Sequence, residues 1–197
     1  QLAKKAIIGG DDEQVSPQAV GIDQDKQRNL IDMYIKDKVA NSHLYDLNSS
    51  LYDILKTSFP VLTLKEHFRS VPMIAAYSNF ISYDGIIKPL RESSSTKVQP
   101  ALKLVKLDGI KNEDRVNEAE ANYIADEILR IKDEPDYEGK TIGVISLASE
   151  DQAKFIDKLL IEKLSLQDYD RLNILCGRPA AFQGDERDII FLSTVDS

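Results

Sequence analysis

Apolar residues recur along this chain at two spacings, and each spacing predicts a different kind of element. Short apolar runs predict buried strands at 5–8, 141–145, 172–175 and 189–192, and alternating leucines predict another strand at 102–107. Apolar positions three and four residues apart predict helices at 27–39, 50–55, 70–84, 119–131 and 149–164. Because strands alternate with helices from about residue 100 onward, we expect an α/β fold with a doubly wound parallel sheet.

Prolines and small polar residues mark the ends of these elements. Pro60 interrupts the pattern, and a domain boundary there gives domains of residues 1–60 and 61–197. Ser70 is expected to be the N-cap of a helix that carries Pro72 in its first turn.

Composition excludes several classes of protein. With 42% hydrophobic and 29% charged residues in 197, the chain can bury a core and is not a disordered tail. No apolar stretch is long enough to span a bilayer. The single cysteine, Cys176, leaves no internal disulfide, and two histidines without further ligands make no zinc site, so we expect a cytoplasmic protein. The sequence begins with Gln1, and we expect that residues preceding it were removed.

Polar chemistry is concentrated in three segments beside predicted strands. Residues 182–188, Phe-Gln-Gly-Asp-Glu-Arg-Asp, come directly before the last strand. Residues 9–17, Gly-Gly-Asp-Asp-Glu-Gln-Val-Ser-Pro, follow the first strand. Residues 64–72 read Leu-Lys-Glu-His-Phe-Arg-Ser-Val-Pro. A glycine among polar residues at a strand end lets the backbone approach a ligand closely, although ordinary solvated turns have the same composition.

In this order the three segments resemble the third, fourth and fifth motifs of superfamily 1 helicases, specifically the subgroup of the nonsense-mediated decay helicases and their bacterial relatives. The resemblance spans nearly the whole chain. It implies a RecA-like, P-loop NTPase-type fold, with the end of a first motor domain in residues 1–60 and most of a second in 61–197. It also implies ATP and Mg²⁺ as cofactors. The implied partners are single-stranded DNA or RNA and the first motor domain of the same polypeptide, with no membrane.

The resemblance assigns nucleotide-binding roles to particular residues. Gln14 would sense the γ-phosphate, and Asp11 with Gly10 would fix the loop that couples nucleotide state to strand grip. Arg69 would fork onto phosphate oxygens, and Phe68 would stack on the adenine. The alternatives from the residues alone are a capped turn for the first group, a surface salt bridge for Arg69 and a core position for Phe68.

In the last motif the resemblance places Glu186 on the ribose hydroxyls, and it gives Gln183 and Gly184 the task of shaping the loop. Arg187 and Asp188 are expected to pair at the strand entrance.

Three further residues match nucleic-acid contacts of the family. Ser146 and Gln152 flank the end of the strand at 141–145, and a capping box formed with Ser149 explains Gln152 equally well. Arg178 stands in the stretch where the family has a threonine that grips a backbone phosphate. Its charge could replace that contact, and an ordinary exposed loop arginine is the alternative. The net charge of −8 argues against a broad basic surface, but not against a local groove between two domains.

Parts of the expected motor are missing from the sequence. No glycine-rich loop ending in Gly-Lys-Ser or Gly-Lys-Thr occurs, and no acidic metal-binding pair precedes Gly10. Because the chain also ends before the sixth motif, we expect it not to hydrolyse ATP by itself. His67 is expected to be a hydrogen-bonding group beside Arg69.

Two other functions stay open at this stage. The first is a motor-like module without catalysis that binds nucleic acid or protein. The second is a two-metal nuclease built from Asp11, Asp12 and Glu13 together with the acids at 185, 186 and 188, which leaves Arg69 without a role.

Overall fold

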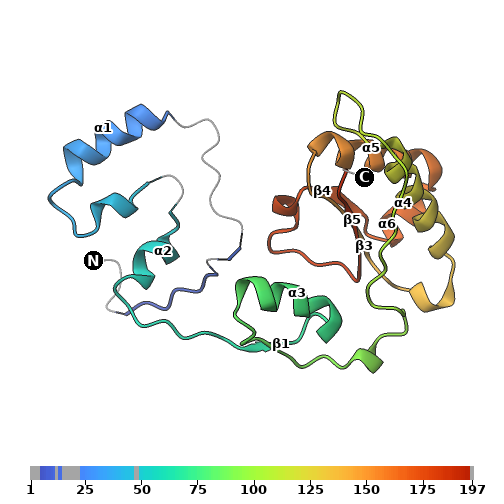
Figure 1. The fold of residues 1–197 in the computed structure, drawn as a ribbon, viewed down its shortest axis with the longest axis horizontal. Coiled ribbons are helices and arrows are strands. Elements are labelled where there is room, and N and C mark those ends of the chain that lie inside the picture. Colours follow the sequence, from blue (N-terminus) through green and yellow to red (C-terminus); the bar gives the residue numbers. More distant parts are fainter. Residues whose placement is uncertain (1–4, 12, 15–22, 47–48, 196–197) are drawn as a thin grey trace. The chain divides into compact units, whose positions relative to one another are not determined.

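The computed structural model describes residues 5–11, 13–14, 23–46 and 49–195. The chain divides into two compact units, Gln1–Lys65 and Glu66–Ser197 (Figure 1).

The first unit consists of short helices with well-formed N-terminal caps. Helix α1 (Gln24–Tyr34) begins at Asp23, whose carboxylate accepts hydrogen bonds from the amides of Asp25 and Lys26. Helix α2 (Leu51–Lys56) begins with a capping box between Ser50 and Asp53. The 3-10 helix η1 (Ser42–Leu44) lies between them in the chain. Neither α1 nor α2 has a buried residue, so local capping rather than a core defines these helices.

The strand predicted at 5–8 does not form. These residues have no regular structure, and the side chain of Ile7 is fully exposed. A strand is stabilised by hydrogen bonds to a neighbouring strand, and the described residues of this unit include none.

The second unit contains a three-stranded parallel sheet with β3 (Ile142–Ser146) at its centre. Strand β4 (Leu175–Gly177) pairs on one side of β3 and strand β5 (Ile189–Ser193) on the other. In register, Val144 of β3 lies opposite Cys176 of β4 and Phe191 of β5. Both pairings are parallel, as the alternation of strands and helices predicts.

Helices cover one face of this sheet and build the core. Helix α4 (Glu118–Ile131) packs against α5 (Glu150–Lys163), and α5 packs on β3 and β4. The fully buried side chains Ile128, Ile156 and Leu160 meet Ile142 and Val144 of the central strand in this core. On the other side of the sheet, a side chain at Gly143 would meet Phe182, at the end of the 3-10 helix η4 (Pro179–Phe182), and Arg187. Both α4 and α5 thus cover one face, and the doubly wound arrangement stays a prediction.

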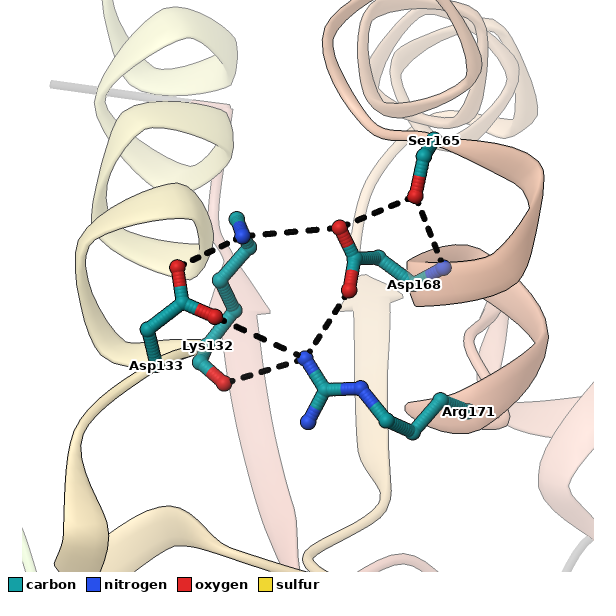
Figure 2. A network of polar contacts seen from close by, with 5 residues as sticks. All are labelled: Lys132, Asp133, Ser165, Asp168 and Arg171. Atoms are coloured by element: carbon teal, nitrogen blue, oxygen red, sulfur yellow. Dashed lines mark hydrogen bonds and ion pairs between the residues drawn. The ribbon is translucent and has the colours of Figure 1, made fainter.

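A polar network ties the end of α4 to helix α6 (Leu166–Arg171) (Figure 2). Lys132 lies 2.6 Å from Asp133 and 3.4 Å from Asp168. Arg171 donates to Asp168 at 3.0 Å and to the carbonyl of Lys132 at 3.2 Å. Ser165 caps α6 by accepting a hydrogen bond from the amide of Asp168. Because each charge has an opposite partner, this network is a structural link between the two helices.

A smaller parallel pair opens the second unit. Strand β1 (Glu66–His67) pairs with β2 (Lys88–Pro89), and helix α3 (Pro72–Ser82) connects them. The N-cap of α3 is Val71 and not Ser70 as predicted, since Pro72 takes the first helical position. The strand predicted at 102–107 is also absent, and Leu104 is 95% exposed. The remaining 3-10 helices are η2 (Ser93–Ser95), η3 (Pro135–Tyr137) and η4 (Pro179–Phe182).

Candidate functional site

The loop that leaves β1 presents Phe68 and Arg69 on a tethered backbone. The ring nitrogen Nε2 of His67 accepts a hydrogen bond of 3.0 Å from the amide of Ser70. The amide of Leu90, just after β2, donates to the carbonyl of His67 at 2.8 Å. His67 is thus a hydrogen-bonding group, as predicted. Phe68 is 67% exposed, which rules out a core position and leaves its ring free to stack on a ligand.

The loop before β5 is a type II turn over residues 182–185. Gln183 has φ −65° and ψ 118°, Gly184 has φ +80°, and the amide of Asp185 donates to the carbonyl of Phe182 at 3.0 Å. A positive φ at the third position requires glycine in practice. The predicted loop-shaping role of Gln183 and Gly184 therefore has a concrete backbone geometry.

Arg187 links this loop to the segment that precedes β4. Its side chain is only 8% exposed and donates to the carboxylate of Asp185 at 2.7 Å and to the carbonyl of Asn173 at 2.8 Å. A hydrogen bond from the amide of Glu186, together with the Arg187 guanidinium, lowers the pKa of Asp185. Asp185 is therefore ionised at neutral pH and keeps Arg187 paired.

Asp188 anchors the other end of the loop. Its carboxylate accepts from the amide and the hydroxyl of Thr141, each at 3.0 Å, and from Lys140 at 3.2 Å. Partial burial opposes ionisation, but these donors outweigh it and lower the pKa of Asp188. Arg187 and Asp188 both lie just before β5. They bond to different partners and not to each other, as the sequence had led us to expect they would.

The two loops meet through Arg69 and Glu186. The Nε of Arg69 lies 2.7 Å from Oε2 of Glu186, and the two side chains are 67% and 66% exposed. The residues are far apart in the sequence, so only the fold brings them together. The result is an exposed guanidinium, an exposed carboxylate and, beside them in the chain, an exposed aromatic ring.

Arg91 also reaches this place, and sequence reasoning missed it. Its Nη1 donates to the backbone carbonyl of Arg69 at 2.7 Å. No strand at 88–89 was predicted, so the signal came only with the fold: Arg91 lies two residues after this strand, and neighbouring parallel strands end at the same edge of a sheet.

The remaining nucleotide-site candidates lie in the first unit. Gln14 donates from Nε2 to the carboxylate of Asp11 at 2.9 Å, and the amide of Glu13 donates to the same carboxylate at 3.1 Å. Gly10 faces the ring of Tyr52, which a side chain at this position would meet at 2.6 Å. Asp11 and Gln14 close a turn in the first unit, whereas Arg69 and Glu186 belong to the second unit.

Two of the three predicted nucleic-acid contacts are interior residues. The side chain of Gln152 is fully buried, accepts from the amide of Asn117 at 2.8 Å and donates to the hydroxyl of Ser193 at 3.1 Å. Ser146 is also fully buried and accepts from the amide of Ser149. Both predictions need correction, because neither side chain reaches a surface where a strand could bind. Gln152 does not complete a capping box either, since its amide group bonds to Asn117.

Arg178 is exposed at the start of η4, where a phosphate could reach it. Cys176, on strand β4, packs against the core. Burial and the nearby Asp157 raise the pKa of its thiol, so the thiol is not a reactive thiolate.

ATP and Mg²⁺ fit these residues differently. A guanidinium, an aromatic face and a carboxylate match a triphosphate, a base and a ribose. Among residues 5–11, 13–14, 23–46 and 49–195, no three metal-binding side chains converge on one point. We therefore derive no step through a metal ion, and the acids at 185 and 188 are engaged in anchoring the loop. No helix in the described part of the chain is both long and apolar enough to cross a membrane.

Comparison with known proteins identifies the family. A sequence model of the family described as "AAA domain" matches residues 47–197, which is most of the chain. Curated proteins gave no match. The parallel α/β architecture of the second unit agrees with this match. We conclude that this chain belongs to the AAA domain family, with a helicase-like fold of the kind found in superfamily 1 helicases.

Proposed function

We propose that this chain is part of an ATP-dependent DNA or RNA helicase or translocase, which couples ATP hydrolysis to movement on single-stranded nucleic acid. The second unit corresponds to the second RecA-like motor domain and the first unit to the end of the first motor domain. The observation that carries this proposal is the contact between Arg69 and Glu186, which joins a phosphate-binding group and a ribose-binding group from separate segments.

Each exposed residue has a task that suits its chemistry. Arg69 binds the terminal phosphate, since a guanidinium is always charged and presents parallel donors to phosphate oxygens. Phe68 stacks on the adenine, and Glu186 accepts hydrogen bonds from the ribose hydroxyls. The type II turn at Gln183 and Gly184 fixes the backbone that leads to Glu186 and so sets the position of its carboxylate. Glu186 pairs with the Nε of Arg69, so bound ATP competes with this carboxylate for the guanidinium.

The turn formed by Asp11 and Gln14 is the proposed sensor from the first motor domain. The amide of Gln14 is held by the carboxylate of Asp11. In this proposal the amide of Gln14 would bond to the γ-phosphate of ATP, and other residues of the motor would hold the Mg²⁺. Arg178 is the exposed cation that we retain as a nucleic-acid contact.

Turnover is the direct test of this function. The sequence has no phosphate-binding loop of the Gly-Lys-Ser or Gly-Lys-Thr type, so we would measure ATPase activity on a polypeptide that joins these residues to such a loop. We expect turnover that single-stranded DNA or RNA stimulates and that Arg69→Ala reduces at least about 100-fold, as for other removed phosphate ligands. Arg130→Ala is the matched control, because Arg130 is an exposed arginine near the end of α4 that pairs with Glu127 and Glu134.

The opposite result has a clear meaning. Absence of strand-stimulated turnover in that polypeptide would contradict the helicase proposal. A motor-like module that binds nucleic acid or protein without catalysis would then be the better account.

A further inference from the structure

Arg91 lies outside any helix or strand, and its side chain bonds to a loop that is distant from it in the sequence. It lies after β2 and before η2, and its guanidinium crosses to the loop that follows β1. There Nη1 donates to the carbonyl of Arg69 at 2.7 Å, while Nε lies 3.4 Å from the hydroxyl of Ser95. No carboxylate of the described residues forms an ion pair with Arg91, in contrast to Arg69, Arg130 and Arg187.

The carbonyl that Arg91 binds belongs to the residue that carries the candidate phosphate contact. Hydrogen bonds fix the loop on both sides of Arg69: His67 accepts from the amide of Ser70, and the amide of Leu90 donates to the carbonyl of His67. With Arg91 on the carbonyl between them, the backbone from residue 67 to residue 70 is held at three points. A side chain as long as arginine positions its charge well only when its own backbone is fixed.

We propose that Arg91 is a positioning residue that fixes the backbone of Arg69 so that its guanidinium meets the terminal phosphate of a nucleoside triphosphate. This inference rests on the proposed function and adds to it a residue outside the resembled motifs. Arg91 acts through Arg69, and the two residues should therefore behave as one unit.

The test measures binding of inorganic tripolyphosphate to this chain in four forms: wild type, Arg91→Ala, Arg69→Ala and the double variant. We expect Arg91→Ala to weaken binding on the order of five-fold, the equivalent of one net hydrogen bond. In the Arg69→Ala background the same change should have no effect. Arg91→Lys keeps one donor and the charge, and should restore part of the affinity. Arg130→Ala controls for the loss of one exposed arginine elsewhere.

A second readout does not depend on any ligand. Hydrogen exchange of the Ser70 amide, which is bonded to His67, should accelerate in Arg91→Ala and stay unchanged in Arg130→Ala. Unchanged exchange, or an equal loss of tripolyphosphate affinity with and without Arg69, would overturn the inference. If Arg69→Ala has no effect on tripolyphosphate while exchange still accelerates, the positioning role of Arg91 holds and the proposed nucleotide function fails.

Discussion

Arg69 and Glu186 lie 2.7 Å apart, although the loop after β1 carries one and the loop before β5 carries the other. Both side chains are about two-thirds exposed, so the ion pair itself adds little to stability. The surface salt bridge that the residues alone allow for Arg69 is therefore present, with its Nε paired to a carboxylate.

Replacing the acid of this pair should therefore increase the binding of a bare polyphosphate. For Glu186→Gln we expect tripolyphosphate to bind on the order of three-fold more tightly, as the loss of an exposed ion pair implies. The advantage of ATP over tripolyphosphate should shrink, because a neutral amide oxygen is a weaker acceptor for the ribose hydroxyls than a carboxylate. Isothermal titration at two salt concentrations measures both effects.

Two controls define this result. Glu150→Gln removes an equal charge at an exposed position at the start of α5 and should leave both affinities unchanged. The gain should also disappear when Arg69 is alanine. A gain that survives without Arg69 would show that Glu186 repels anions from a distance and does not compete for the guanidinium.

Gly184 should be required for the shape of its loop. Its φ of +80° is unfavourable for other residues, and a side chain there meets nothing within 4 Å, so Gly184→Ala changes only backbone preference. We expect a loss of about 1 kcal/mol in the free energy of unfolding and weaker ATP binding, since Glu186 shifts. Urea unfolding and ATP titration check the two parts.

Gly85→Ala is the matched control for this change. Gly85 has φ +73° with equally open surroundings, but it lies between α3 and β2, where its amide bonds to the carbonyl of Asn79 and not to the loop. It should lose similar stability without any change in ATP affinity. Equal effects of the two variants on ATP would contradict a specific role for the turn at Gly184.

Gln152 should matter for stability and not for direct contact with nucleic acid. Gln152→Ala leaves the amide and carbonyl of Asn117 buried without these partners. We expect a loss of about 3 kcal/mol in the free energy of unfolding, measured in urea. The exposed Gln167→Ala on α6 should change it by less than about 0.5 kcal/mol. A nearly neutral Gln152→Ala variant would show that this buried network is unimportant.

Glu127 should make the fold sensitive to acid. Hydrogen bonds from Arg130, opposed by burial and reinforced by Lys103, lower the pKa of Glu127 from 4.5 to about 2. A carboxyl whose pKa is lower in the folded protein stabilises it above pH 4.5, and this contribution is lost as the pH falls towards 2. Compared with Glu127→Gln, the wild type should be more stable by about 2 kcal/mol at neutral pH, and the difference should vanish near pH 2.

Thermal unfolding from pH 7 to pH 2 measures this difference. Glu162→Gln is the control, because Glu162 forms only a long, exposed ion pair with Lys158. Its effect should be small at every pH. A wild-type advantage from Glu127 that persists at pH 2 would mean that packing, not ionisation, accounts for it.

The sequence by itself determined the elements that have strong local signals. The helices at 118–131 and 150–163 and the strands at 142–146 and 189–193 follow from apolar periodicity, and Gly184 from the demand of a turn for positive φ. The three polar segments were also visible as motifs, and the AAA domain match at residues 47–197 covers those at 64–72 and 182–188. Local signals are sufficient in these cases because the interactions concerned span only a few residues.

Only the tertiary structure decided which polar residues face solvent and which meet. Gln152 and Ser146 are interior because α4 and β5 close over them, and the sequence around either residue does not contain that fact. Residues 5–8 and 102–107 have apolar patterns typical of strands but no partner strand among the described residues. Arg69, Glu186 and Arg91 come together from three separate segments. Such contacts depend on how parallel strands and their loops are placed side by side, and the apolar periodicity along the sequence does not specify that placement.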